Sequence, residues 1–234
     1  MRLVRIASRH WLKTSILRTL CGSTDAASFD VPFGGVRVQR LVDVKSREDI
    51  FPEYLGTPIE WLLRYHCLGE PQPESTGQPH LIIAMCIDNR KRLNIPPEFA
   101  YILRTAGTRL LGNEFELSFA IAIGGVSTIA LIGHTQCGMT KVFEQREQFV
   151  SGLVERGGVT PEVARAHFDA SASGYAITSP VDSILHKAKV VQKVLPDILV
   201  APLLYRVEDD KLAQIRNTPV ESANSGSGRP IHAN

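Results

Sequence analysis

The chain has 234 residues, of which 44% are hydrophobic and 21% are charged, and its formal net charge is +2. This length suits one domain of ordinary size with appendages, and the nearly balanced charge gives no support for a nucleic-acid partner. The cysteines are Cys21, Cys67, Cys86 and Cys137, and because they form no recognisable disulfide framework we expect a reducing compartment.

Residues 1–24 form a basic arm with no acidic residue. An arginine-rich, acid-free arm is typical of a mitochondrial presequence, although a plain extension of a cytoplasmic protein explains it more simply. We therefore predict a cytoplasmic protein, with a mitochondrial or other organelle matrix as the alternative. Residues 1–45 are assigned to a basic, partly disordered extension and residues 46–218 to the domain. Residues 219–234 are rich in Ser, Gly, Asn and Pro and are assigned to a disordered tail.

The first predicted helix runs from Thr57 to about Cys67. Thr57 is suited to cap it, Pro58 fits its first turn, and Glu60 stands at the capping-box position. Apolar residues recur at helical spacing along it. Cys67 and His66 are neighbours that point about 100° apart, so we expect Cys67 in the core and His66 at the surface rather than a shared metal site.

Three apolar runs predict strands: His80–Ile87, Phe99–Arg104 and Ser127–Gly133. The first and last are separated by room for a crossover, so we predict parallel pairing within one sheet. The uncharged stretch 117–140 is long enough for a membrane span, but Gly124-Gly125 divides it into a helix and a buried strand, and we predict no membrane segment.

Further helices are predicted after Asn113, over Met139–Glu155, and after Thr160 and Ser179. Val200–Ile215 predicts a last strand or hairpin at the sheet edge. The fold class is therefore α/β, with a mostly parallel central sheet flanked by helices.

Metal-ligating side chains stand at the carboxyl ends of two of these strands. Cys86 ends the first run, and His134 and Cys137 follow the last. Because parallel strands place their carboxyl ends on one edge of a sheet, the three side chains are expected to converge. Two thiolates and an imidazole are ligands that Zn2+ prefers, and a set of three leaves the fourth position open, as in a catalytic site.

An acid–base pair follows the first cysteine. The guanidinium of Arg90 is suited to hold the carboxylate of Asp88 ionised and in one orientation. A carboxylate held beside a zinc-bound water accepts its hydrogen bond and aims the nucleophile. Asp88 and Arg90 are therefore the predicted catalytic residues.

At this point the residues resemble a known family. Cys86-x-Asp88-x-Arg90, then Arg104-Thr105-Ala106-Gly107, then His134-x-x-Cys137-Gly138 is similar to the pattern of the β-carbonic anhydrases. The resemblance runs from about Thr57 to Ile215. The chain departs from the family at two positions, with Asn89 where the family usually has Ser and Thr105 where it usually has Asn.

The resemblance implies zinc-dependent, reversible hydration of carbon dioxide to bicarbonate and a proton. It also implies a homodimer or higher even oligomer with the Thr57–Cys67 helix at the interface. Two alternatives stay open: a hydrolase of carbon disulfide or carbonyl sulfide, and a non-catalytic zinc-binding homologue. In some relatives the counterpart of Asp88 moves onto the zinc when its arginine pair breaks.

Overall fold

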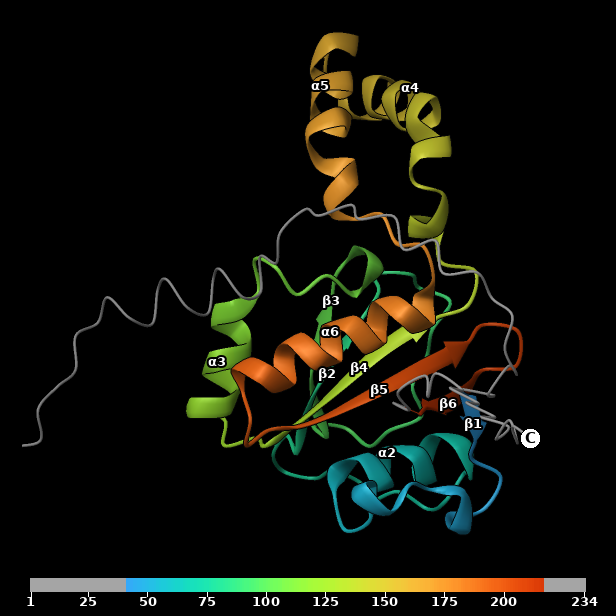
Figure 1. Ribbon diagram of the computed structural model, residues 1–234, viewed down its shortest axis with the longest axis vertical. Helices are drawn as coiled ribbons and strands as arrows, with labels where there is room; N and C mark the ends of the chain where they lie inside the picture. Colours follow the sequence, from blue (N-terminus) through green and yellow to red (C-terminus); the bar gives the residue numbers. More distant parts are fainter. Residues whose placement is uncertain (1–40, 217–234) are drawn as a thin grey trace, which may run out of the picture.

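The computed structural model describes residues 41–216 of the chain (Figure 1). The basic arm of residues 1–24, with its resemblance to a presequence, and the whole of the predicted tail therefore lie outside the described residues.

One mixed sheet forms the centre of the molecule, with strand order β1-β6-β5-β4-β2-β3. The strands are β1 (Leu41–Asp43), β2 (Leu81–Met85), β3 (Ala100–Arg104), β4 (Thr128–His134), β5 (Leu199–Arg206) and β6 (Lys211–Ile215). β2 pairs in parallel with both β3 and β4, and β4 pairs in parallel with β5. β6 is antiparallel to both β5 and β1. The predicted α/β fold with its parallel centre is confirmed.

Five α-helices and several short 3-10 turns surround the sheet in the described part of the chain. The helices are α2 (Pro58–Cys67), α3 (Glu114–Ala122), α4 (Arg146–Gly157), α5 (Pro161–Ser171) and α6 (Pro180–Val194). The 3-10 turns are η1 (Arg47–Asp49), η2 (Pro52–Tyr54), η3 (Ala106–Thr108), η4 (Gly138–Lys141), η5 (Phe143–Gln145) and η6 (Ala172–Gly174). The predicted caps Thr57, Thr160 and Ser179 each accept a backbone N–H of the first turn.

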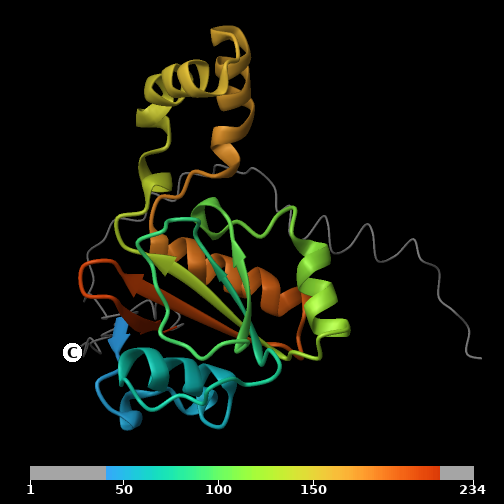
Figure 2. The same ribbon diagram turned by 180° about the vertical axis from the view of Figure 1, so that it is seen from behind.

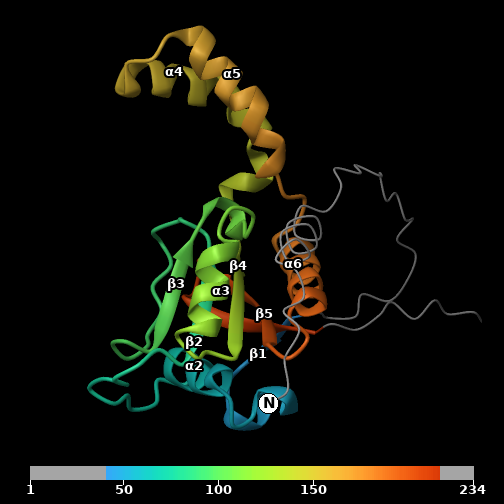
Figure 3. The same cartoon turned by 90° about the vertical axis from the view of Figure 1, so that its left-hand side faces the viewer.

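Helices α2, α3 and α6 cover the two faces of the sheet, whereas α4 and α5 extend away from it (Figure 3). Side chains that alternate along β2 separate two cores: Ile83 and Met85 pack with α2, whereas Ile82 and Ala84 pack with α3 and α6. Strands β2 and β4 are buried on both faces, as parallel strands between two helical layers are. The carboxyl ends of β2 and β4 consequently lie side by side.

A helical hairpin projects from the body of the molecule (Figures 1 and 2). α4 ends at Gly157, and Gly158 takes the left-handed conformation, with φ of 68°, before α5 begins. The continuous helix predicted over Met139–Glu155 is wrong, because η4 and η5 interrupt it before α4. Thr140 folds back in the first of these turns, where its hydroxyl donates to the Cys137 carbonyl at 2.7 Å.

Three further expectations are corrected. His66 is buried rather than exposed. The loop that follows β2 packs against it, and the backbone N–H of Asn94 in that loop donates to His66 Nδ1 at 3.0 Å. The β5–β6 hairpin does not lie at the sheet edge, since β1 adds a strand outside it. The apolar stripe of α2, which suggested an interface, packs against the chain's own sheet, and the partner contact proposed for α2 loses that support.

Within residues 41–216, no helix is long and apolar enough to cross a membrane. The apolar stretch that raised this question is the end of α3, the Gly124-Gly125 turn and β4.

Candidate metal centre

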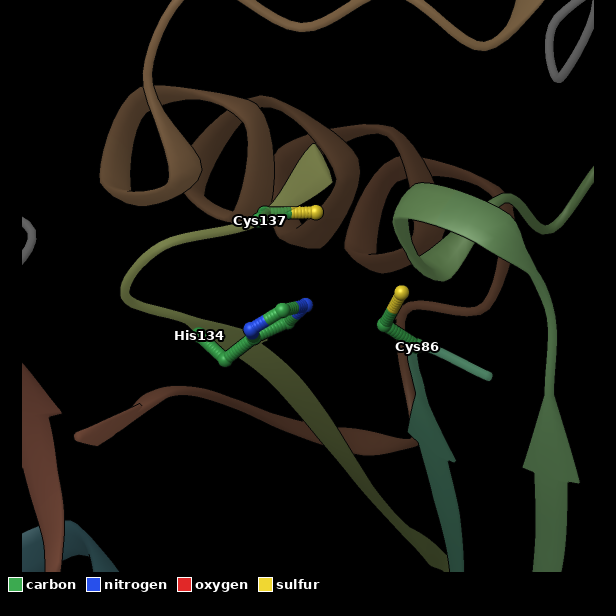
Figure 4. A group of neighbouring side chains, drawn as sticks. All are labelled: Cys86, His134 and Cys137. Atoms are coloured by element: carbon green, nitrogen blue, oxygen red, sulfur yellow. The ribbon is translucent and has the colours of Figure 1, made fainter. Parts of the chain in front are cut away.

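Three buried metal-ligating side chains meet at the carboxyl edge of the sheet. Cys86 follows β2, His134 ends β4, and Cys137 lies in the turn beyond it. One ligand atom from each lies within 4.8 Å of the others. Figure 4 shows the two sulfur atoms and the imidazole ring directed at a common point. Among the described residues this is the one such group, and the predicted convergence of the three side chains is found.

The imidazole of His134 is oriented for metal binding. Its Nδ1 lies 2.8 Å from the carbonyl oxygen of Thr135, so Nδ1 carries the hydrogen and donates it. Its Nε2 is buried and has no hydrogen-bond partner in the described chain. A buried nitrogen with a free lone pair, aimed between two thiols, fits a metal ion.

The thiols of Cys86 and Cys137 change each other's pKa through a hydrogen bond. A hydrogen bond from Cys137 holds the pKa of Cys86 well below its usual range, and the backbone N–H of Gly107 adds a second donor at 3.4 Å. The pKa of Cys137 is raised, because its thiol donates the hydrogen bond to Cys86 and because burial disfavours its charged form. A divalent cation would allow both thiolates to form.

Beside the cluster, Arg90 holds Asp88. Its Nη2 lies 2.7 Å from Asp88 Oδ2 and its Nε lies 3.1 Å from Oδ1. These bonds hold the pKa of Asp88 well below its usual range, although partial burial opposes them. Asp88 Oδ2 also lies 3.9 Å from His134 Nδ1, so the carboxylate stands next to the ligand cluster.

Gln136 completes the support of Arg90, and the sequence reasoning missed it. Its side-chain oxygen accepts from Arg90 Nη1 at 3.0 Å, and its carbonyl accepts from Nη2 at 3.1 Å. Gln136 has a positive φ of 56°, which turns the chain between His134 and Cys137. Its place inside the His-x-x-Cys segment was the available signal, but that spacing does not reveal which way the side chain turns.

Two lysines near the cluster were also missed. Lys91 is only 1% exposed, and its ammonium donates to the Asp88 carbonyl at 2.9 Å. Lys187, on α6, donates to the Gly107 carbonyl at 2.6 Å. Lys91 reaches the site through a turn within its own loop, and Lys187 reaches it through packing between distant elements. Neither arrangement leaves a pattern in the local sequence.

Arg104, at the end of β3, ties the loop after β2 to the sheet. Its guanidinium donates to the carbonyl oxygens of Cys86, Asp88 and Lys91 at 3.2–3.4 Å. The hydroxyl of Thr105 donates to the Arg109 carbonyl at 2.6 Å and not to a residue of the cluster. The Arg104–Gly107 segment therefore positions backbone around the site.

A small cavity adjoins His134 and Cys137. It is lined by Gly107, Thr108, Gly133, His134, Cys137, Ile177, Pro180, Ser183 and Ile184. The lining is largely apolar on the side away from the ligands. The volume of the cavity, about 10 Å³, is room for about one water molecule.

Similar solved structures are mostly β-carbonic anhydrases. Isoform I of this enzyme from Trichomonas vaginalis has a TM-score of 0.50 and 21% identity, over 66% of this chain and 92% of that one. The carbonic anhydrase of Glaciozyma antarctica has a TM-score of 0.49 and 22% identity, over 71% of this chain and all, 100%, of that one. An apo carbon disulfide hydrolase has a TM-score of 0.45 and 20% identity, over 78% of this chain and 100% of that one.

No protein-family model matches the chain, and no curated protein matches it. The structural likeness shows the fold, which is that of the β-carbonic anhydrases. The Cys-His-Cys group is a feature of this chain's own structure, and it is able to bind a metal ion. At these identities the likeness does not establish the activity.

Proposed function

We propose that this protein is a zinc-dependent carbonic anhydrase, which converts carbon dioxide and water into bicarbonate and a proton. The observation that carries the proposal is the convergence of Cys86, His134 and Cys137 within 4.8 Å. Two sulfur ligands and one nitrogen ligand favour Zn2+ over harder cations such as Mg2+ or Ca2+.

The donor set fits an open zinc site. Three protein ligands leave one position of a tetrahedral ion for water. Zinc lowers the pKa of bound water from 15.7 to about 7–9, so that hydroxide is available near neutral pH.

Asp88 and Arg90 are proposed to orient the nucleophile. The Asp88 carboxylate, which is ionised at neutral pH, accepts the hydrogen bond of the attacking water and fixes its direction. Arg90 holds that carboxylate in place, and Gln136 holds Arg90.

The first test separates the metal site from the fold. We expect Cys86→Ser and His134→Ala to lose zinc and hydration together, because each removes one of three ligands. Cys67→Ser is the matched control: Cys67 is also buried, but its Sγ faces the Leu212 carbonyl at 3.4 Å, away from the cluster. Zinc is measured by plasma emission spectroscopy, and full zinc content in both ligand variants contradicts the assignment.

Activity is measured by stopped-flow hydration of carbon dioxide, with and without a chelator. The proposal expects hydration by the zinc-loaded protein and loss of hydration on chelation. A fully zinc-loaded protein that hydrates nothing between pH 6 and 9.5 overturns the proposed function. Turnover of carbon disulfide or carbonyl sulfide is assayed on the same preparation as the alternative outcome.

A further inference from the structure

Lys187 is a partly buried lysine outside the ligand cluster, and its hydrogen bonds connect it to the cluster through Gly107. It lies on α6, one turn after Ser183, and its Nζ donates to the Ser183 hydroxyl at 2.9 Å. The same Nζ donates to the carbonyl oxygen of Gly107 at 2.6 Å, across the space between α6 and η3. This second bond is short and charge-assisted, the stronger kind of hydrogen bond.

Gly107 connects Lys187 to Cys86 through hydrogen bonds of its backbone. Its backbone N–H donates to Cys86 Sγ at 3.4 Å, while its carbonyl is held by Lys187. Gly107 has a left-handed φ of 63°, so its two peptide groups turn in different directions. A Cβ at this residue would stand 3.4 Å from Met139 Cγ and from the Tyr175 carbonyl. Gly107 is thus in contact with Met139 and Tyr175, and its N–H and its carbonyl are both hydrogen-bonded.

The charge of Lys187 complements the cluster. Burial lowers its pKa to about 8, whereas the thiols of Cys137 and Cys86, when ionised, raise it. The ammonium is therefore still mostly protonated at neutral pH despite its burial. A cation that is partly removed from water requires hydrogen-bond acceptors, and the Gly107 carbonyl and the Ser183 hydroxyl supply them.

We propose that Lys187 is a positioning residue of the metal centre, which holds Gly107 so that its amide donates to Cys86. The proposal rests on the proposed zinc site but not on carbon dioxide turnover. Hydrogen bonds to ligating atoms commonly affect metal affinity 10–100-fold.

The test compares three substitutions on α6. Lys187→Met removes the charge and the donor but keeps an unbranched side chain. Lys187→Arg keeps a charged donor. Lys189→Met removes an exposed lysine from the same helix and serves as the matched control.

Zinc affinity is measured at pH 7 by competition with a chromophoric chelator. We expect Lys187→Met to weaken it at least about tenfold, Lys187→Arg to stay within about threefold of the parent, and Lys189→Met to match the parent. With cobalt(II) in place of zinc, the thiolate-to-cobalt absorption band should shift in Lys187→Met only, because Cys86 loses its ordered donor.

Unchanged zinc affinity and an unchanged cobalt spectrum in Lys187→Met overturn the proposal. So does a loss of affinity that is accompanied by an equal loss of stability in the metal-free protein, because general packing then explains it. If the parent binds zinc but hydrates nothing, the proposed function fails and this inference stands. If the parent binds no zinc, both fail.

Discussion

A substitution of Asp88 can test the chemistry of the site without changing the size of a side chain. Asp88→Asn keeps the size of the side chain but removes the charge that pairs with Arg90 and accepts the water's hydrogen bond. We expect this variant to keep its zinc and to lose at least about tenfold in turnover, or about 1.4 kcal/mol of barrier. Initial hydration rates and zinc content are measured together. A variant that matches the parent at every pH removes Asp88 from the mechanism.

The pH dependence of hydration follows from the ligand charges. Two thiolates cancel the charge of a divalent zinc ion, so its water should be less acidic than water on zinc held by three histidines, which titrates near 7. We expect hydration to rise with pH through an apparent pKa above about 7. Asp88 does not cause this rise, because Arg90 holds its pKa well below the usual range and it stays ionised from about pH 6 to 9.5.

At the scale of elements, Glu70 joins η1 to α2. Its carboxylate accepts from Arg47 Nε at 2.7 Å and from Arg64 Nε at 2.9 Å. These two arginines lower its pKa from 4.5 to about 2. A lowered pKa in the folded state means that the contact stabilises the fold above pH 4.5 and that this stability is lost as the pH falls towards 2.

We therefore expect Glu70→Gln to unfold at lower urea concentration than the parent at pH 7, and the difference to shrink as the pH falls towards 2. The effect is small because the pair is near the surface. Glu74→Gln, in the loop that follows, is the control. A difference between Glu70→Gln and the parent that is constant with pH shows that the ion pair is not its cause.

The packing of α6 on β4 depends on Gly133. A Cβ at this residue would meet Ile184 Cγ1 at 2.7 Å and the Pro180 carbonyl at 3.3 Å. We expect Gly133→Ala to destabilise the metal-free protein by about 1–3 kcal/mol in urea unfolding. Gly138→Ala is the matched control, since no atom lies within 4 Å of its added Cβ. Equal stability of the two variants contradicts the close approach of α6.

At the scale of the whole molecule, an apolar surface is exposed on β3 and α3. It is formed by Tyr101 and Ile102 on the edge strand and by Phe115, Phe119 and Ile123 on the helix. Phe115 is 76% exposed and Ile123 72% exposed. A helix that is apolar around most of its surface, next to an edge strand with unpaired backbone groups, is typical of an interface.

A homodimer or higher even oligomer stays a prediction, and this surface replaces α2 as its expected site. Phe119→Glu should convert the oligomer to monomers at micromolar concentration, because a charge is then placed in the apolar contact. Leu55→Glu is the control, because Leu55 is 54% exposed and lies just before α2. This control should leave the oligomer intact. Mass is measured by light scattering. A monomeric parent contradicts the oligomer, and dissociation by Leu55→Glu alone restores α2 as the interface.

The sequence by itself determined the central strands, most helix starts and the convergence of Cys86, His134 and Cys137, which could hold a metal ion. It did so because buried parallel strands are continuous apolar runs and because Thr57, Thr160 and Ser179 cap by local hydrogen bonds. Cys86 and His134 were placed together because the carboxyl ends of parallel strands share one edge.

Only the tertiary structure decided what surrounds that edge. Gln136, Lys91 and Lys187 reach the site through turns and through packing between distant segments, which leave no periodic pattern in the sequence. The sequence likewise did not predict the burial of His66 or which surface covers α2. The apolar stripe of a helix has the same pattern whether the chain's own sheet or a partner covers it. Local hydrogen bonds and strand periodicity act between near neighbours, whereas the choice of covering surface depends on the whole fold.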